Sequence, residues 1–409
     1  VHAGSFKKPG TGQTDWYTYE ELGEVLIPYL KESGYNCVEF LPLSEHPCDE
    51  SWGYQNTGFF APTARYGTAE GLQKLVDQMH QNGIYVLLDF VPVHFAVDAY
   101  GLKEFDGTPL YEYPAAAVGQ SEWGSCNFMH SRGEIQCFIQ SCADYWLRVF
   151  HADGLRMDAV SRLIYWQGDP NRGVNGSTLD FLKGMNYGLQ QRHPTAILIA
   201  EDSTSFPKVT APVEYGGLGF DYKWDLGWMN DTLDYFKKTP DERRENLGKL
   251  TFSMMYAWNE HYILPFSHDE NVHGKATIVQ KMYGDYEGKF PQARALYLYM
   301  AIHPGKMLDF MGNEFAQLRE LDRNVVDEGA ALAGRGDLAR ECRFAAVIQV
   351  VSVEECLQVP CSEIENAFDQ AITFVVFQGG VVVLVPQQEA QRAEQDRLSG
   401  AGFARDDVQ

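Results

Sequence analysis

The sequence predicts an α/β protein built on a (β/α)8 barrel, and two observations carry that prediction. Apolar strand-like runs alternate with helical patterns along the chain, which is typical of parallel βαβ units. Three of the runs end in a carboxylate, namely Asp158, Glu201 and Asp269. A carboxylate at the end of a buried strand is costly unless it is paired or functional. Since a (β/α)8 barrel gathers its catalytic groups at the C-terminal strand ends, we expect the three carboxylates to share one pocket.

Eight runs fit the barrel strands, and eight strands are enough to close a barrel. We expect these strands at residues 1–5, 36–42, 84–93, 152–158, 196–201, 220–223, 262–268 and 307–311. Between the second and third of them, Leu72, Leu75, Val76 and Met79 recur at helical spacing, and Gly83 supplies a C-terminal stop. This segment is predicted to be a crossover helix.

Two segments depart from the alternation of strands and helices. Residues 95–131 show no clear period and are rich in Gly, Pro and Tyr, so they are predicted to form a loop region inserted after the third strand of the 1–320 barrel. Residues 321–409 contain no Trp, Tyr, His, Met or Lys, although the whole chain has 22 Tyr and 11 His. We interpret them as a degenerate or foreign C-terminal segment, disordered in part, with one hairpin formed by ITFVVF and VVVLV.

Composition excludes several classes of partner. The chain has 409 residues, of which 45% are hydrophobic, enough to bury a large core. A net charge of −23 disfavours nucleic acid and anionic membrane surfaces, because both need basic stripes. No apolar run reaches the length of about 20 residues that a membrane span needs. The 8 cysteines form no CxxC pair, so we expect neither a zinc site nor a disulfide framework, and we expect a cytoplasmic location.

The spacing of the charged residues indicates glycoside chemistry. Arg156 and Asp158 are two apart on a predicted strand, so their side chains share one face, and the guanidinium is expected to keep Asp158 ionised at neutral pH. Glu201 ends an apolar run that would raise its pKa and keep a proton available for a leaving oxygen. An ionised carboxylate and a protonated one, about 5–5.5 Å apart, are the nucleophile and the acid/base of a retaining glycosidase.

Four motifs carry a resemblance to a known family. They are DFVPVH from Asp89, DGLRMDAV from Asp153, IAED from Ile199 and SHDENVHGK from Ser267. Together with ESWGYQNTGFF and FMGNEFAQ, they make the chain similar to the α-amylase superfamily and, within it, to the bacterial 1,4-α-glucan branching enzymes. The resemblance covers residues 1–320. Members of that family carry β-sandwich domains before and after the barrel, and we expect the N-terminal one to be absent here and the C-terminal one to be aberrant.

The resemblance implies a role for each matching residue. Asp158 is the nucleophile, Glu201 the general acid/base and Asp269 the third carboxylate, which grips the hydroxyls of the sugar. The residues expected to stack on the sugar, hydrogen-bond to it or brace the nucleophile are Tyr54, Asp89, His94, Arg156 and His268. A calcium site of the family's kind would need Asn in place of Val93, so we expect no structural metal there and no cofactor.

These roles predict a glycosyltransferase of glycogen biosynthesis, which cleaves α-1,4-glucan chains by a retaining double displacement and transfers them to a glucan 6-hydroxyl. An α-glucan hydrolase, amylase-like or trehalose-releasing, would deliver water to the same intermediate. A non-catalytic glucan-binding protein and an inactive truncated product stay open. We expect a monomer whose partner is an α-1,4-glucan. Five tryptophans are either sugar platforms or core, with core as the default: Trp16, Trp52, Trp123, Trp166 and Trp258.

Overall fold

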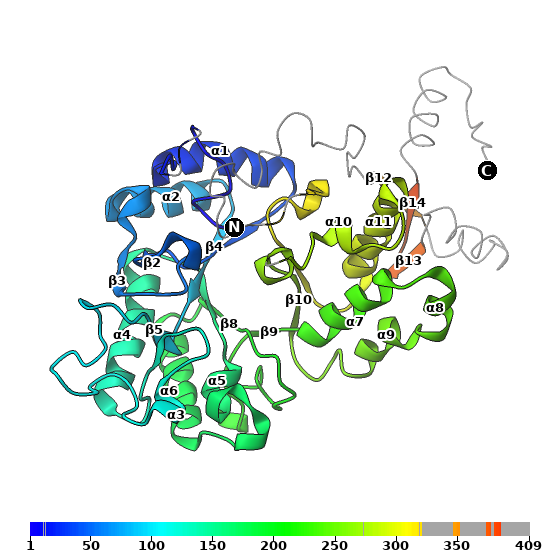
Figure 1. The fold of residues 1–409 in the computed structure, drawn as a ribbon. Helices are drawn as coiled ribbons and strands as arrows, with labels where there is room; N and C mark the ends of the chain where they lie inside the picture. Colours follow the sequence, from blue (N-terminus) through cyan, green and yellow to red (C-terminus); the bar gives the residue numbers. More distant parts are fainter. Residues whose placement is uncertain are drawn as a thin grey trace, which may run out of the picture.

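A parallel sheet that curls into an incomplete barrel forms the centre of the molecule (Figure 1). The computed structural model describes residues 1–10, 12, 14–272, 274–318, 320, 347–351, 374–377 and 380–385. The sheet has 7 strands, and their order in space follows their order along the chain. From one edge to the other they are β1 (Cys37–Phe40), β4 (Tyr85–Phe90), β7 (Gly154–Met157), β8 (Ile197–Ala200), β9 (Tyr222–Trp224), β10 (Tyr262–Phe266) and β11 (Lys306–Asp309).

The predicted fold class is confirmed, but the expectation that residues 1–5 form the first strand is wrong. Only Val1 joins the sheet. Its amino group donates to the carbonyl of Glu39 at 2.6 Å, and its own carbonyl accepts the Leu41 N–H at 2.9 Å. The chain then turns away, because the amides of Ser5 and Phe6 both donate to the carbonyl of His2. The other seven predicted strands correspond to the seven strands of the sheet.

The longer helices lie outside the curled sheet (Figure 1). They are α1 (Tyr19–Glu32), α2 (Ala69–Gln81), α4 (Gly133–Val149), α6 (Gly176–Arg192), α7 (Leu226–Lys237) and α11 (Tyr286–Ile302). The predicted crossover helix is α2, and the four apolar residues that predicted it are all buried. Thr68 begins this helix, since its side chain accepts the Gly71 N–H. Shorter helices are α3 (Ala116–Gly119), α5 (Ser161–Ile164), α8 (Pro240–Glu245), α9 (Gly248–Thr251) and α10 (Ile278–Lys281).

Small antiparallel pairs supplement the barrel. β2 (Ser44–Glu45) pairs with β3 (Gly58–Pro62), and β5 (His94–Phe95) pairs with β6 (Cys126–Asn127). The second pair lies in the predicted loop region, where it fixes the end of that region beside His94. A separate sheet has the order β12-β14-β13, with β12 (Val347–Val351), β13 (Phe374–Phe377) and β14 (Gly380–Val385). The interpretation of residues 321–409 as degenerate or foreign stays a prediction, and most of them lie outside the described residues.

Inside the barrel, a layer of apolar side chains is followed by charged groups toward the C-terminal ends of the strands. Leu87, Ile199, Trp224 and Ile263 form one buried cluster across four strands. Asp89 lies on β4 two residues after Leu87, and side chains two apart on a strand share a face. The register then pairs Asp89 with Arg156 on β7. The parallel strands thus carry their polar groups toward the same C-terminal edge of the sheet.

The close approach of β7 to β8 makes Gly154 sensitive to substitution. A Cβ at this position would lie 2.2 Å from the carbonyl oxygen of Ile197 and 2.8 Å from Leu87. We expect Gly154→Ala to lower the free energy of unfolding by about 2–4 kcal/mol, because backbone cannot move aside as a side-chain end can. Gly184 of α6 is the control, since a Cβ there meets nothing within 4 Å. Urea unfolding should show Gly184→Ala to be neutral or stabilising, and equal stability of the two variants would contradict the strand packing described.

Candidate active site

A single guanidinium connects the polar groups at the C-terminal edge of the barrel. Arg156 is fully buried, and its Nη1 donates to Asp89 Oδ1 at 2.6 Å and to Asp158 Oδ1 at 2.8 Å. Its Nη2 lies 3.2 Å from Glu201 Oε2. Nη1 also donates to the Tyr54 hydroxyl at 3.4 Å, and that hydroxyl donates to Asp89. Two of the three carboxylates predicted to be catalytic therefore contact the same cation.

Backbone geometry fixes the two carboxylates that follow β7 and β8. The Asp158 N–H donates to the Phe90 carbonyl at 2.9 Å, which continues the ladder between β4 and β7 past the last strand residue. The next residue, Ala159, has a φ of 49°, a conformation that costs energy for a residue with a side chain. This turn aims the Ala159 N–H at Glu201 Oε2, with a distance of 2.6 Å. The turn after Asp158 thus orients Glu201.

The third predicted carboxylate reaches the same site through an aromatic stack. The Tyr54 and His268 rings lie parallel within 18°, with centroids 5.3 Å apart. His268 Nε2 is 3.3 Å from Asp269 Oδ1, and the Asp269 side chain is about half exposed. His94 joins from β5, where its Nε2–H donates to the Tyr54 carbonyl at 3.0 Å. The structure thus links all eight predicted site residues through direct contacts, and their roles stay predictions.

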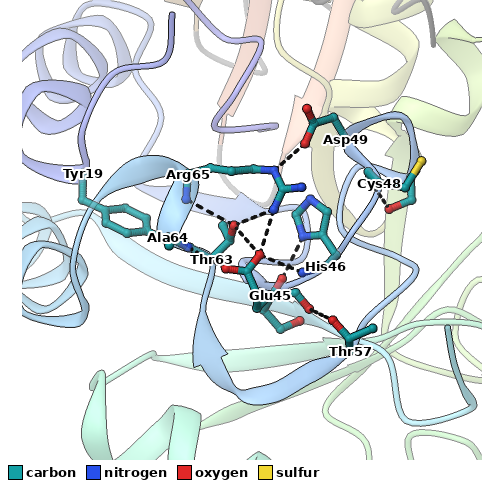
Figure 2. A network of polar contacts seen from close by, with 11 residues as sticks. Tyr19, Glu45, His46, Cys48, Asp49, Thr57, Thr63, Ala64 and Arg65 are labelled. Atoms are coloured by element: carbon teal, nitrogen blue, oxygen red, sulfur yellow. Dashed lines mark hydrogen bonds and ion pairs between the residues drawn. The ribbon is translucent and has the colours of Figure 1, made fainter. Parts of the chain in front are cut away.

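A second polar network holds the loop that carries Tyr54. Figure 2 shows Arg65 reaching both Glu45 and Asp49, at the two ends of the turn before that loop. Glu45 also accepts the N–H groups of His46 at 3.0 Å and Ala64 at 2.9 Å. Burial opposes the ionisation of Glu45, but these hydrogen bonds and Arg65 outweigh it and lower the pKa of this carboxyl. The loop is therefore anchored by an ionised carboxylate some ten residues before Tyr54.

Burial governs the titration of the carboxylate pair. It raises the pKa of Asp158 well above the usual range and that of Glu201 to about 7, while Arg156 acts in the opposite direction on both. The negative charge of Glu201 further raises the pKa of Asp158. The sequence-based expectation that Arg156 keeps Asp158 fully ionised thus omits the larger effect. Burial and mutual repulsion therefore both favour binding of a proton by this pair of carboxyls.

The two site histidines are neutral hydrogen-bonding groups. Burial lowers the pKa of His94 to about 4 and also lowers that of His268. Because the carbonyl of Tyr54 can only accept, Nε2 of His94 carries the hydrogen and Nδ1 keeps a lone pair. Nδ1 is buried and has no hydrogen-bond partner among the described residues.

Two tryptophans lie at the site, namely Trp123, for which core was the default expectation, and Trp224, which was not considered from the sequence. Trp224 lies against the Arg156 guanidinium, with its ring centroid 4.2 Å from the Arg156 Cζ. Trp123 lies beside His94 with ring centroids 5.1 Å apart and is 45% exposed. The default assignment of tryptophans to the core is wrong for Trp123 and for Trp258, which is 82% exposed. Only the alternation of β9, which places Tyr222 and Trp224 on one face, hints at a role for Trp224.

Neither a metal-binding cluster nor a membrane-spanning helix is found in the described part of the chain. Among its residues, no group of three or more His, Cys, Asp and Glu side chains could hold a metal ion. None of the described helices has the length and apolar character needed to span a bilayer.

The position of Arg156 leads to a test by pH. In Arg156→Met, the three carboxyls around this position lose their cation, so we expect the free energy of unfolding to fall by about 3–5 kcal/mol at pH 8. The pKa values of Asp158 and Glu201, which burial already raises, rise further in the variant, so the stability that these two groups contribute is present at low pH and is lost as pH rises. The deficit should therefore be smaller at pH 5. Arg148→Met is the control, because that exposed pair with Asp144 is worth at most about 1 kcal/mol. Denaturant unfolding with equal deficits at both pH values would contradict the arrangement.

Comparison with known proteins places this site in a family. The model of the alpha amylase catalytic domain matches residues 24–106. The 1,4-alpha-glucan branching enzyme GlgB of Bacillus subtilis is 49% identical over 321 residues, which are 78% of this chain and 51% of the relative. GlgB of Fusobacterium nucleatum is 48% identical over 317 residues, again 78% of this chain and 51% of the relative. The chain thus spans about half the length of these curated relatives.

Solved structures agree on the fold. The α-amylase of Geobacillus thermoleovorans, crystallised with acarbose, superposes with a TM-score of 0.62 at 16% identity over 82% of this chain and 73% of the other. A type III pullulan hydrolase of Thermococcus kodakarensis gives a TM-score of 0.60 at 15% identity, covering 83% of this chain and 66% of the other. The chain belongs to the α-amylase superfamily and is similar to bacterial GlgB proteins over 78% of its length.

Proposed function

We propose that this protein is a 1,4-α-glucan branching enzyme, which cleaves an α-1,4-glucan chain and transfers it to the 6-hydroxyl of a glucan. The observation that carries the proposal is the contact of Asp158 and Glu201 with one buried guanidinium, beside Tyr54, His94 and His268. A retaining glycoside reaction needs one ionised and one protonated carboxyl in one pocket. A single proton bound by this pair provides that state.

The reaction proceeds in two displacements at the anomeric carbon. Asp158 attacks this carbon while Glu201 protonates the glycosidic oxygen, so the bond to the leaving chain breaks as an ester to Asp158 forms. Glu201, now a carboxylate, takes the proton of the acceptor 6-hydroxyl. The alkoxide oxygen then bonds to the anomeric carbon, and Asp158 is released. Asp269 and the neutral histidines hydrogen-bond to the sugar hydroxyls.

Sequence identity to named relatives favours transfer over hydrolysis. The two proteins named as branching enzymes are 48–49% identical to this chain, whereas the α-amylase and the pullulan hydrolase that share its fold are 15–16% identical. The proposed partner is accordingly an α-1,4-glucan, handled by a monomer. We place the reaction in the cytoplasm, and five cysteines that are free thiols in the described residues support a reducing compartment.

Incubation with amylose separates transfer from hydrolysis. We expect iodine colour to fall without an increase in reducing ends, because each cleaved chain is re-attached. Asp158→Asn should reduce this rate by at least about 10³-fold, since no glycosyl ester can form. Asp180→Asn, an exposed acid-to-amide change on α6, is the matched control and should keep the full rate. A rise in reducing ends that matches the loss of colour would make the protein a hydrolase and overturn the proposal.

The proton held by the carboxylate pair predicts a specific pH dependence. Because the pKa of Glu201 lies at about 7, the acid loses its proton above that pH and kcat/KM should fall as the pH rises from 7 to 9. On the acid side kcat/KM should fall as the Asp158–Glu201 pair binds its second proton. Initial rates of branching over pH 5–9 measure both limbs. A rate that stays constant up to pH 9 would contradict the assignment of Glu201 as the acid.

A further inference from the structure

We infer that Trp224 is a positioning residue that sets the plane of the Arg156 guanidinium and thereby the charge on Asp158. This inference rests on the proposed use of Asp158 as the nucleophile. It concerns the part of the site inside the barrel, where the apolar cluster of Leu87, Ile199, Trp224 and Ile263 meets the charged groups. No residue in that layer other than Trp224 has an aromatic ring against the guanidinium.

The contact between the two side chains is a stack inside the barrel. Arg156 and Trp224 are both fully buried, and the Arg156 Cζ lies 4.2 Å from the ring centroid of Trp224. Tyr54 also faces the guanidinium, but its centroid is 6.0 Å away. A guanidinium over an indole ring within about 6 Å is attracted by the ring quadrupole, and the attraction increases when both groups are desolvated. Trp224 therefore makes the closer aromatic contact.

Hydrogen bonds alone leave the guanidinium free to tilt. Nη1 makes the hydrogen bonds to Asp89 and Asp158, whereas Nε and Nη2 make none among the described residues, although Nη2 lies within ion-pair distance of Glu201. A planar group held mainly at one nitrogen can rotate about that point. The face of Trp224 opposes this rotation. It thus keeps Nη2 directed at Glu201 and Nη1 at Asp158.

The surroundings of Trp224 agree with a role for its ring face. The Nε1–H of Trp224 is buried without a hydrogen-bond partner among the described residues, so the indole is not held by a polar contact. On another side the ring borders a cavity of about 80 Å³, which Glu39, Ser267 and His268 also line. The ring thus has the cation on one face and open space on another side, and no polar contact among the described residues fixes its orientation.

Loss of the ring face has a defined electrostatic consequence. The charged and titratable groups around Arg156 are Asp89 on β4, Asp158 after β7, Glu201 after β8, and Tyr54 and Glu39 from the β1 side, with His268 and Asp269 after β10. Of these, Asp158 has the most to lose, because its negative charge is stabilised by the Nη1 hydrogen bond against burial and against Glu201. A displaced guanidinium makes Asp158 harder to ionise. The acid limb, meaning the low-pH side of the pH–rate profile on which the rate falls, therefore moves to higher pH.

The experiment compares three single variants of the full chain. Trp224→Leu removes the ring face, Trp224→Phe keeps a smaller face, and Trp228→Leu removes an equally buried indole that contacts Phe266 and Tyr299 instead. Each is assayed with an α-maltosyl fluoride donor, whose fluoride release reports glycosyl ester formation without an acceptor, and with amylose. Rates are measured over pH 4–9, and thermal unfolding is followed in parallel.

For Trp224→Leu we expect kcat to fall about 100-fold with KM within about threefold of the wild type, and the acid limb to rise by about one pH unit. Trp224→Phe should recover most of the rate and the wild-type limb. Trp228→Leu should unfold at lower temperature yet keep the wild-type limb; if it does not fold, Trp228→Phe replaces it. A folded Trp224→Leu with the wild-type kcat and acid limb would overturn the inference, as would the same limb shift in the Trp228 variant.

The donor assay separates this inference from the proposed function. Wild-type release of fluoride without branching of amylose would overturn the branching assignment, while the fluoride rates of the variants would still decide the role of Trp224. Absence of fluoride release from the folded wild type would overturn both.

Discussion

The site depends on one buried positive charge that is shared by several carboxylates. Arg156 is completely enclosed, and Asp89, Asp158 and Glu201 lie within 3.2 Å of its terminal nitrogens. A buried guanidinium without partners would be unstable, and so would three buried carboxylates without a cation. Each side therefore requires the other. Because the cation cannot neutralise all three, the cluster favours binding of a proton, and acid/base chemistry on a sugar requires a protonated carboxyl.

The parallel sheet is what allows so many charges to meet at one point. The register pairs Asp89 with Arg156, and the first residues beyond β7 and β8 add Asp158 and Glu201. The loops supply the groups proposed to contact the sugar. Tyr54 comes from the turn anchored by Arg65 and Glu45, and His268 stacks on it from the residues after β10. The strands thus fix Asp158 and Glu201, and the loops place Tyr54 and His268 beside them.

Local sequence patterns predicted seven strands, the crossover helix and the clustering of the three carboxylates with Arg156, because each depends on period or on position at a strand end. The other site residues, such as Tyr54 and His94, were implied only by the family resemblance. The first strand was predicted wrongly, since a run of five residues does not reveal that His2 closes a turn. The pKa of Asp158 was misjudged for a related reason. Its neighbour Arg156 is visible in the sequence, whereas its burial and the approach of Glu201 come only with the fold. Trp224 escaped notice because it meets Arg156 from β9, a contact between strands that no local pattern encodes.

The most direct measurement is the identification of the residue that becomes glycosylated. The protein would be treated with a slow-reacting fluorinated α-glucosyl fluoride, digested, and its peptides sequenced by mass spectrometry. The arrangement around Arg156 predicts a single adduct, carried by Asp158 in the peptide that contains DGLRMDAV, and no adduct in Asp158→Asn. An adduct on Glu201 or Asp269, or one that persists in Asp158→Asn, would contradict the account.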